Sequence, residues 1–417
     1  MLVGVCAGAA SGASGGASPS STSSTSSSTS TAPAPSIPAP PRNVRNPLAG
    51  RGMWMWYVSQ SSGGSVSSII STARSYGLST LLIKSGDGPT YWSQFNSTLV
   101  DELHAAGLKV CAWQYLYGDH PIFEAEVGAT AVQAGADCLL IDAESEYQGK
   151  YVQAQEYVKK LRQLIGANFP LALAGFPYVD YHPSFPYSVF LGPGGAQFDA
   201  PQMYWHDIGV SVDEVYNHTY SYNLPYGRPI EPLGEVAGNP APGQVIRFRQ
   251  LSRAYFAGGV SWWDWQESSA RDWKALDQPA GSLTGFTPQA TFPTLSLRGA
   301  GGIWAGDLVV WAQEHLLRAG YTATIDGDFA TQTQVAVESF QTAHGLPVTG
   351  IVDPATWQAL LRYPAPPVTW SKHKGKSTAS AARAALILAP PWSSHLKARG
   401  YEIPPHLGAG RWPDHAF

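Results

Sequence analysis

Short apolar runs alternate with amphipathic segments between about residue 52 and residue 267. Eight of the runs have the length and the flanking glycine and polar residues of strands, and they span residues 53–60, 80–85, 109–115, 137–143, 171–176, 200–205, 230–235 and 259–264. Between them, apolar residues three or four positions apart predict helices over residues 65–76, 94–106, 122–134, 151–165, 212–222 and 243–255. Strands that alternate with helices in this way are typical of βαβ units and a parallel sheet.

The number of predicted strands favours a closed sheet. Eight strands with helices between them, over about 220 residues, fit a (β/α)8 TIM barrel. An open doubly wound sheet would need a glycine-rich phosphate-binding loop, which the sequence lacks. The segment after the fifth strand is rich in loop residues and lacks a full helical pattern. We therefore predict an α/β fold, with the (β/α)8 barrel at residues 49–280.

Glycine, threonine and proline mark a linker at residues 281–293, and the pattern changes after it. Three amphipathic segments follow, with turn residues between them, at residues 306–319, 331–344 and 354–361. They predict a small all-α three-helix domain over residues 294–362. Residues 363–417 are rich in proline and carry a basic run, and we expect irregular structure there.

The first part of the chain has the composition of a tether. Residues 11–41 are almost all serine, threonine, alanine, glycine and proline, which predicts a disordered linker within residues 1–48. The first ten residues look like the end of a signal-peptide apolar region without the basic residues that should precede it. We therefore expect an exported protein whose signal starts upstream of Met1. No run approaches 18 apolar residues, so no membrane span is expected.

The composition of the chain argues against two classes of binding partner, nucleic acid and membrane surfaces. Charged residues make up 13% of the chain and the net charge is -4, which leaves no basic surface for nucleic acid or a membrane. The three cysteines are too few for a disulfide framework and form no zinc motif, so we expect no metal and no cofactor. Cys111 and Cys138 lie on neighbouring predicted strands. We expect two buried free thiols there, with a disulfide as the alternative.

Residues 136–147 carry the clearest chemical feature. A continuous apolar run from Cys138 to Ile141 is followed by Asp142 and Glu144, as if a buried parallel strand ended in two acids. Because side chains alternate along a strand, the two carboxylates leave on the same side, with Cα atoms roughly 6–7 Å apart. Barrel enzymes keep their chemistry at the C-terminal ends of the strands. The alternative is an acidic loop without a chemical role.

The ends of the other predicted strands add polar and aromatic residues: Lys84, Asp87, Gln114, Tyr117, Glu146, Tyr178, Gln202, Tyr204, Trp205, Glu235, Trp262, Trp263, Asp264 and Gln266. Aromatic rings stack on sugars and carboxylates supply acid and base, so this set suits glycoside hydrolysis. The hydrolase motifs H-E-x-x-H and G-x-S-x-G are absent. The residues that we expect to bind substrate are Lys84, Gln114, Gln202, Trp205, Trp262 and Asp264.

Three short motifs resemble glycosidases of the chitinase type and, more loosely, the barrel lysozymes that cut bacterial cell wall. On the fourth, sixth and eighth predicted strands, they are I-D-A-E at residues 141–144, Q-M-Y-W at 202–205 and S-W-W-D at 261–264. The resemblance implies that Glu144 protonates the glycosidic oxygen. Asp142 and Tyr204 would then orient the N-acetyl group of the sugar as the nucleophile, over Trp262 as the floor of the site.

Two departures from these families leave alternatives open. Leu140 stands where the chitinase pattern D-x-D-x-E has its earlier aspartate, and the first predicted strand lacks the aspartate of barrel lysozymes. A second route would pair Glu144 with Glu235, as in retaining enzymes whose carboxyl groups are about 5–5.5 Å apart. A rival from another class is a non-catalytic glycan-binding or wall-anchored scaffold.

The C-terminal segments resemble the peptidoglycan-binding domain type 1. The similarity rests on Q-E-H-L-L-R-A-G-Y from residue 313, followed by D-G-D-F, A-V-x-x-F-Q, H-G-L and D-P-x-T-W-x-x-L. Thr349 and Gly350 depart from the Asp-Gly that is usual at the second turn. The resemblance implies attachment to bacterial cell wall, with a helical spacer as the alternative. We thus expect an extracellular, wall-associated and monomeric glycoside hydrolase that acts on peptidoglycan or a related N-acetylated glycan.

Overall fold

The computed structural model describes residues 45–371. The predicted signal-like start, almost all of the linker and the tail from residue 372 lie outside the described residues, so these parts of the prediction stay predictions. Within the described range, no helix combines the length and the apolar character needed to cross a membrane.

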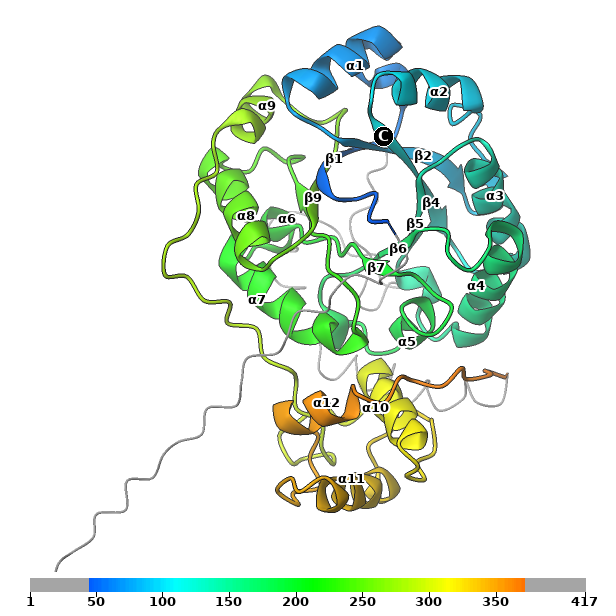
Figure 1. Ribbon diagram of the computed structural model, residues 1–417, viewed down its shortest axis with the longest axis vertical. Helices are drawn as coiled ribbons and strands as arrows, with labels where there is room; N and C mark the ends of the chain where they lie inside the picture. Colours follow the sequence, from blue (N-terminus) through cyan, green and yellow to red (C-terminus); the bar gives the residue numbers. More distant parts are fainter. Residues whose placement is uncertain (1–44, 372–417) are drawn as a thin grey trace, which may run out of the picture. The chain divides into compact units, whose positions relative to one another are not determined.

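Eight parallel strands of the described chain form a ring in which each strand lies beside the next one in sequence (Figure 1). They are β1 (Gly50–Met55), β2 (Thr80–Asp87), β4 (Lys109–Leu116), β5 (Cys138–Ala143), β6 (Leu171–Ala174), β7 (Phe198–Asp199), β8 (Leu233–Glu235) and β9 (Gly259–Trp263). β9 pairs with β1, and two single parallel bridges, Asp199↔Ile230 and Gln202↔Leu233, join the β7 and β8 segments. β3 (Thr90–Tyr91) lies antiparallel on β2. The predicted (β/α)8 barrel is confirmed.

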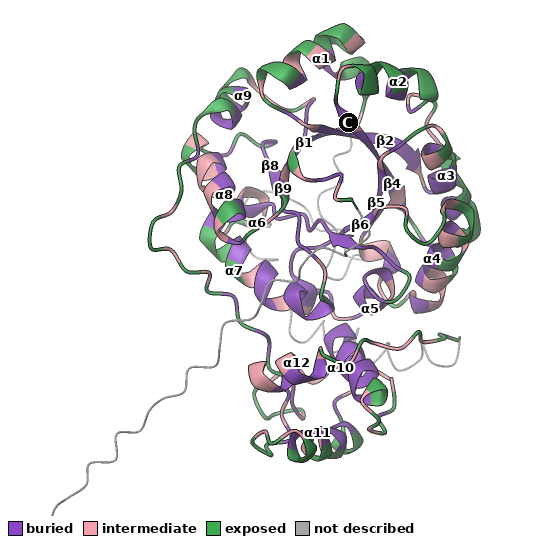
Figure 2. Cartoon of the chain, in the orientation of Figure 1, coloured by how far each residue is buried: buried purple, intermediate pink, exposed green. Residues whose placement is uncertain are grey.

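Helices surround the ring of strands and turn a buried face towards it (Figure 2). They are α1 (Val66–Ser75), α2 (Ser97–Ala105), α3 (Pro121–Gln133), α4 (Tyr151–Ile165), α7 (Val212–Asn223), α8 (Pro242–Ala254) and α9 (Ala270–Asp277). The connection after β6 holds the short α5 (Tyr187–Phe190), as the loop-rich sequence predicted, and the connection after β7 starts with α6 (Trp205–Ile208). The sequence pattern missed α9, which begins with a capping box between Ser269 and Asp272.

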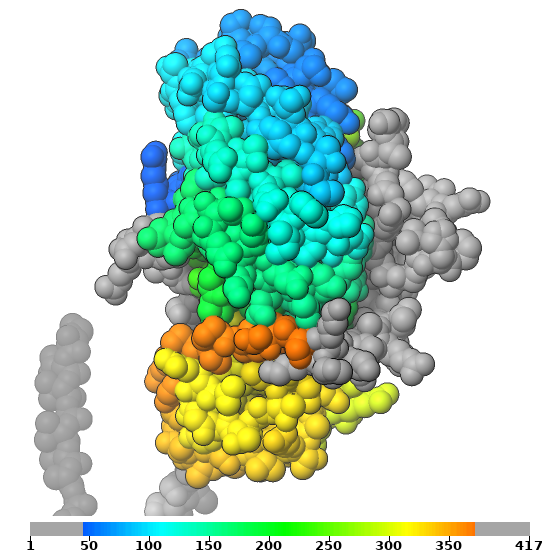
Figure 3. All heavy atoms as spheres, turned by 90° about the vertical axis from the view of Figure 1, so that its right-hand side faces the viewer, coloured from blue at the N-terminus to red at the C-terminus, as the bar shows by residue number. Residues whose placement is uncertain are grey.

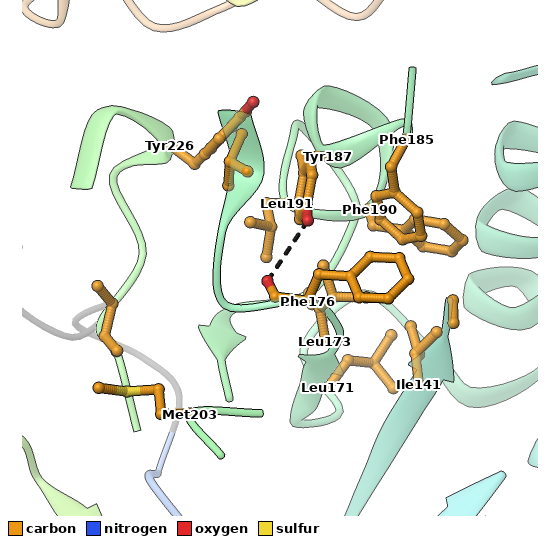
Figure 4. Close-up of a cluster of buried hydrophobic side chains, with 14 of the residues drawn as sticks. Ile141, Leu171, Leu173, Phe176, Phe185, Tyr187, Phe190, Leu191, Met203 and Tyr226 are labelled. Atoms are coloured by element: carbon orange, nitrogen blue, oxygen red, sulfur yellow. Dashed lines mark hydrogen bonds between the residues drawn. The ribbon is translucent and has the colours of Figure 1, made fainter. Parts of the chain in front are cut away.

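Six of the eight parallel strands, β1, β2, β4, β5, β6 and β9, have two buried faces that belong to different apolar clusters. Side chains that point into the barrel form an inner cluster, which includes Trp54, Leu82, Trp113, Leu140 and Trp263. The alternating side chains point towards the helices and join a larger outer core, part of which Figure 4 shows around Ile141, Leu173, Phe176, Phe185 and Phe190. In the space-filling view of Figure 3, the side chains of the helices cover the strands on this side of the barrel. Burial on both faces explains why the strands read as continuous apolar runs.

The segment just before β1 closes the N-terminal end of the barrel. Leu48 is buried and belongs to the inner cluster. Asn46 Nδ2 donates to Glu231 Oε1 at 2.7 Å, and Lys109 Nζ donates to the carbonyl oxygen of Ala49 at 2.9 Å. These contacts tie the segment to β4 and to the residues before β8. This segment therefore keeps solvent at the N-terminal end of the barrel away from the inward-pointing side chains at the C-terminal ends of the strands.

Cys111 of β4 and Cys138 of β5 form a disulfide, so our expectation of two free thiols is wrong. The two residues are paired directly across neighbouring parallel strands, and both side chains point into the barrel. Their Cα atoms are 4.6 Å apart, within the range that a disulfide bridges. The sequence indicated neighbouring strands but not their register, and register decides whether two thiols meet.

Three helices follow the barrel and match the predicted pattern: α10 (Asp307–Arg318), α11 (Thr331–Ala343) and α12 (Pro354–Leu360). A buried glutamine holds the turn after each of the first two helices. Gln313 of α10 accepts the backbone N–H groups of Asp326 and Gly327 at 3.0 and 2.9 Å. Gln341 of α11 accepts the corresponding N–H groups of the next glycine turn. The repeated glutamine explains why the two turns have the same geometry.

The second turn carries Thr349 and Gly350 in place of Asp-Gly. Gln341 Oε1 accepts the N–H groups of these two residues at 2.9 and 3.0 Å, and its Nε2 donates to Thr349 Oγ1 at 3.2 Å. In the first turn, Gln313 Nε2 donates to Asp326 Oδ1 at 2.9 Å. The threonine hydroxyl thus takes the place of the aspartate carboxylate as acceptor. The departure from the family pattern leaves the turn intact.

Replacing Gln341 by alanine should destabilise this helical region by about 2–4 kcal/mol, because two N–H groups lose their acceptor and a cavity opens. Hydrogen exchange of residues 345–353 in the whole chain should accelerate accordingly. Gln334→Ala on the same helix is the matched control. Its Nε2 donates to Glu338 Oε1 in a half-buried pair, and its loss should cost under about 1 kcal/mol. Equal acceleration in both variants would contradict the role assigned to Gln341.

Candidate functional site

Two carboxylates meet at the C-terminal end of β5. Asp142 is the penultimate residue of the strand and is 5% exposed, while Glu144 follows the strand directly and is half-buried. Gln202, which follows β7, donates its Nε2 to Asp142 Oδ1 at 3.1 Å and to Glu144 Oε1 at 2.9 Å. One amide group therefore bridges the two acids, as it can when both side chains leave the strand on the same side.

The surroundings of the pair disfavour two negative charges. Burial raises the pKa of the Asp142 carboxyl well above its ordinary value, and Glu144 raises it further, whereas Lys84 lowers it. Carboxylates that share a donor and lie in a buried place titrate as a pair rather than independently. The arrangement favours a state in which the pair holds one proton. A group of this kind can act as an acid in the neutral pH range.

Two tyrosines face these acids. Tyr204 is nearly buried, and its pKa is raised by burial, then by Asp142, Glu144 and Glu235. Tyr115 of β4 is paired in register with Asp142, and its hydroxyl donates to Glu146 Oε2 at 2.9 Å. We did not predict Tyr115. Its position two residues after the inward-pointing Trp113 was the signal that could have found it.

Lys84 lies in the wall of the barrel next to these acids. Its Nζ donates to Asp87 Oδ2 at 2.7 Å and lies 4.1 Å from the centre of the Trp56 ring. The rings of Trp92 and Trp113 are 4.6 and 4.9 Å away. Burial lowers the pKa of this lysine, while the nearby carboxylates raise it. The tryptophan rings thus surround an ammonium of the protein itself.

Glu235 ends β8 and is 1% exposed. Its carboxylate accepts the backbone N–H of His206 through Oε1 and that of Asp207 through Oε2, the latter at 3.3 Å. Both donors lie in the short helix α6, which directly follows Tyr204. Glu235 therefore anchors the segment that carries Tyr204.

The structure does not bring Gln114 into this group, and the prediction for it is corrected. Gln114 points away from the barrel interior, where its Nε2 donates to the carbonyl oxygens of Gly88 and Glu124 at 2.8 and 2.9 Å. Its side chain is fully buried between β4 and α3. Its side-chain amide links the loop at Gly88 to helix α3. It can do so because side chains alternate along the strand, so that residue 114 points outward while residues 113 and 115 point inward.

Trp205 and Trp262 are corrected for the same reason. Both belong to the outer core, where their ring centres lie 4.9 and 5.2 Å from that of Phe248 on α8. The neighbour Trp263 points inward instead, with its ring 5.6 Å from that of Trp113. Two adjacent residues of a strand lie on opposite faces of the sheet, and our prediction placed Trp262 on the wrong face.

Asp264 follows β9 and is 2% exposed. Its Oδ1 accepts the backbone N–H of Glu267 at 3.0 Å, and burial raises the pKa of this carboxyl to about 7. The peptide bond between Trp263 and Asp264 is cis. This hydrogen bond makes Asp264 the cap of the turn after the last strand, and its predicted contact with substrate stays a prediction.

The C-terminal helices are similar to a known protein family. Residues 305–360 match the family model described as "Putative peptidoglycan binding domain". They form a peptidoglycan-binding domain. No curated protein matches the chain. A solved peptidoglycan-binding protein from Clostridioides difficile is 37% identical over 17% of this chain and 42% of that chain, with a TM-score of 0.15, so this chain spans less than half of that protein.

Other solved structures are similar to more than half of the chain. A class V chitinase from Pseudomonas fluorescens is 11% identical over 55% of this chain and 98% of that chain, with a TM-score of 0.43. The spore cortex-lytic enzyme SleL from Bacillus cereus is 11% identical over 58% of this chain and 76% of that chain, with a TM-score of 0.38. At these identities and TM-scores, the similarities carry no argument about the chemistry of this chain.

Proposed function

We propose that the protein is an exported, wall-associated glycoside hydrolase that cuts peptidoglycan or a related N-acetylated glycan. The observation that carries the proposal is the pair Asp142 and Glu144, bridged by Gln202 at the C-terminal end of a barrel strand. Paired carboxylates with unequal surroundings are what acid-catalysed glycoside cleavage needs. The peptidoglycan-binding domain supports a cell-wall glycan as the partner.

In the proposed mechanism, Glu144 gives its proton to the glycosidic oxygen as the bond to the leaving sugar breaks. A carboxyl oxygen of Asp142 accepts the N–H of the acetamide, and the Tyr204 hydroxyl donates to the acetamide carbonyl oxygen. The carbonyl oxygen attacks the anomeric carbon and stands in for a protein nucleophile. Water then opens the resulting ring as it gives a proton to the Glu144 carboxylate, which restores the acid. The half-exposed position of Glu144 supports its access to substrate, whereas the burial of Asp142 supports an orienting role.

The contacts of Glu235 bear on the alternative route. A carboxylate that accepts two backbone N–H groups at the start of α6 is held in place by them. This supports a positioning role for Glu235, through the Tyr204 segment, over a role as the nucleophile of a retaining pair. For the retaining route to operate, the carboxyl groups of Glu144 and Glu235 would have to lie about 5–5.5 Å apart.

Export is supported by the disulfide between Cys111 and Cys138. Disulfides form and persist in oxidising compartments and are rare in the cytosol. Together with the peptidoglycan-binding domain, the disulfide is in keeping with a protein that works outside the cell membrane.

The direct test is incubation of the purified chain with purified cell walls, followed by assays of released reducing ends and of turbidity. Release of reducing ends supports the hydrolase. The non-catalytic scaffold, which Leu140 at the position of the earlier aspartate favours, predicts binding to walls without release. A chitin oligosaccharide series then separates a preference for peptidoglycan from a preference for other N-acetylated glycans.

The whole chain should sediment with insoluble peptidoglycan, and Gln341→Ala should reduce the bound fraction at least several-fold. The reason is that loss of the Gln341 contacts loosens the turn that carries Thr349 and Gly350 in the binding domain. Gln334→Ala should sediment like the wild type. If all three proteins pellet equally at moderate salt, the helical region is a spacer and binding belongs to another part of the chain.

A further inference from the structure

We propose that Asp307, the first residue of α10 in the peptidoglycan-binding domain, is a positioning residue that holds the turn carrying Glu144 in place on the barrel. The domain is then a structural part of the barrel rather than an anchor on a tether. The inference rests on the proposed function where it concerns catalysis by Glu144, whereas the docking itself can be measured without turnover.

Helix α10 packs against the barrel where the barrel's own helical layer is thin. The barrel and the peptidoglycan-binding domain lie in one compact unit of the chain. In the described connection from β6 to β7, the α-helix α5 has four residues. α10 contacts α5, and its Leu308 and Trp311 belong to the same apolar core as Phe190 of α5. Every residue of α10 from Asp307 to Leu316 is buried. Because a surface helix keeps one polar face, this burial places α10 between the barrel and the rest of its own domain.

The Asp307 side chain is buried and accepts four hydrogen bonds from the barrel. Its Oδ1 accepts the Tyr151 hydroxyl at 2.8 Å and the Ser188 hydroxyl at 2.7 Å. Its Oδ2 accepts the backbone N–H of Ser188 at 2.7 Å and the Tyr226 hydroxyl at 2.8 Å. The three donor residues lie at the start of α4, in α5 and after α7. A carboxylate is costly to bury without donors, so the barrel provides a binding site for this one side chain.

The backbones of the barrel and the domain also meet closely at this point. The Asp307 N–H donates to the carbonyl oxygen of Pro183 at 2.7 Å. Gly306 precedes it with a φ of +112°, and a Cβ there would lie 2.5 Å from Pro183 Cβ and 2.7 Å from the Pro183 carbonyl oxygen. Both the conformation and the space at this position require glycine. An approach of this kind is expected at a fixed contact, whereas a freely moving domain has no need of it.

The loop that follows β6 contacts the turn that carries Glu144. The carbonyl oxygen of Ser184 accepts the N–H of Gly149 at 2.7 Å, and the Ser184 hydroxyl donates to Gln148 Oε1 at 3.2 Å. Ser184 is the next residue after the proline that accepts from α10. The loop that the peptidoglycan-binding domain holds therefore holds the end of the turn.

Tyr151 provides a second and shorter connection. It begins α4 two residues after Gly149, it is buried, and its hydroxyl donates directly to Asp307. Glu144 lies at the other end of the turn, where its carbonyl oxygen accepts the N–H of Tyr147 at 3.0 Å. Asp307 thus holds the turn from two sides, through the loop and through α4. A general acid needs this precision, because a misplacement of about 1 Å can cost about a hundredfold in rate.

The test is hydrogen exchange of the whole chain with Asp307→Asn. Asparagine keeps the size of the side chain, but one oxygen becomes an NH2 group that cannot accept, so barrel donors lose their partner. Exchange of the Gly149 and Ser188 N–H groups should accelerate by about tenfold or more. The amides of β1, opposite β6 in the ring of strands, should keep their rates, which excludes a general loss of stability.

Asp353 provides a matched control in the same domain. Its Oδ1 accepts the Thr356 N–H at 2.8 Å and caps α12, and asparagine is an equally good cap. Asp353→Asn should leave the exchange of Gly149 and Ser188 unchanged. The proposal is overturned if Asp307→Asn leaves the Gly149 N–H at its wild-type rate, or if Asp353→Asn accelerates it as much. Should Asp307→Asn fail to fold, Ser188→Ala removes one of the four donors, and an unmoved Gly149 N–H in that variant would overturn the proposal.

Turnover separates this proposal from the proposed function. On a cleaved wall glycan, Asp307→Asn should lower kcat by about tenfold or more, because the acid is misplaced in the transition state. KM and the fraction bound to insoluble peptidoglycan should stay near wild type. Accelerated exchange with an unchanged kcat would contradict the positioning role. If the wild type cleaves no glycan, the proposed function fails, while the exchange of Gly149 still decides whether Asp307 holds the turn.

Discussion

Glutamine in place of Glu144 should lower turnover on a cleaved wall glycan by roughly 10²–10⁴-fold, the usual effect of removing a general acid. Glutamine keeps the size of the side chain, and its carbonyl oxygen can still accept from Gln202 Nε2, which donates to Glu144 Oε1 at 2.9 Å. What the substitution removes is the proton. The loss should appear in kcat and kcat/KM alike, because protonation of the leaving oxygen belongs to the transition state.

Two neighbouring acids make this prediction specific. Glu146→Gln changes a carboxylate of the same turn, which accepts from the Tyr115 hydroxyl, and should cost far less than Glu144→Gln. Glu235→Gln should also cost less if the acetamide is the nucleophile, since an amide oxygen can still accept the N–H of His206. A loss in Glu235→Gln as large as that in Glu144→Gln would support the retaining pair. Near wild-type turnover in Glu144→Gln would move the active site elsewhere.

Removing the disulfide should cost about 3–4 kcal/mol of unfolding free energy, because it frees a loop in the unfolded chain. Cys111 and Cys138 are 27 residues apart in sequence. At about 1.4 kcal/mol for each factor of ten, the ratio of unfolded to folded protein should rise by roughly 10²–10³-fold. Denaturant unfolding of the double variant Cys111→Ala/Cys138→Ala against the wild type measures the change.

Reduction supplies the control for this prediction. A reducing agent should lower the denaturation midpoint of the wild type towards that of the double alanine variant. It should leave the midpoint of that variant where it is, because Cys6 is its sole remaining thiol. If the wild-type midpoint does not respond to a reductant that opens the bridge, the constraint on the unfolded chain contributes little and packing around the sulfurs explains the stability.

The fold was predictable because apolar runs in this chain are short, regular and bounded by glycine and polar residues. Strands β2, β4, β5 and β9 begin within one residue of the predicted positions. The pairing of Asp142 with Glu144 followed from alternation along a single strand, which needs no knowledge of neighbouring strands. Predictions of this local kind depended on residues that are close in sequence.

The predictions that failed needed information from other strands. Gln114 and Trp262 were placed on the inner face although each lies one position out of phase with the inward residues Trp113 and Trp263. Where polar or aromatic residues stand side by side in the sequence, composition alone cannot tell which of two neighbours points inward. The disulfide was missed because thiol contact depends on the register between β4 and β5, which only the assembled sheet provides.

The closure of the barrel by residues 46–49 sets a limit on how far proteases can shorten this protein. Cleavage that leaves Asn46 and Leu48 in place keeps the inner cluster covered. A cut after Ala49 would remove one hydrogen-bond partner each from Lys109 and Glu231 and open the apolar interior at the end away from the acids. The barrel therefore depends on residues that precede its first strand, and a chain trimmed to Gly50 would lose this closure.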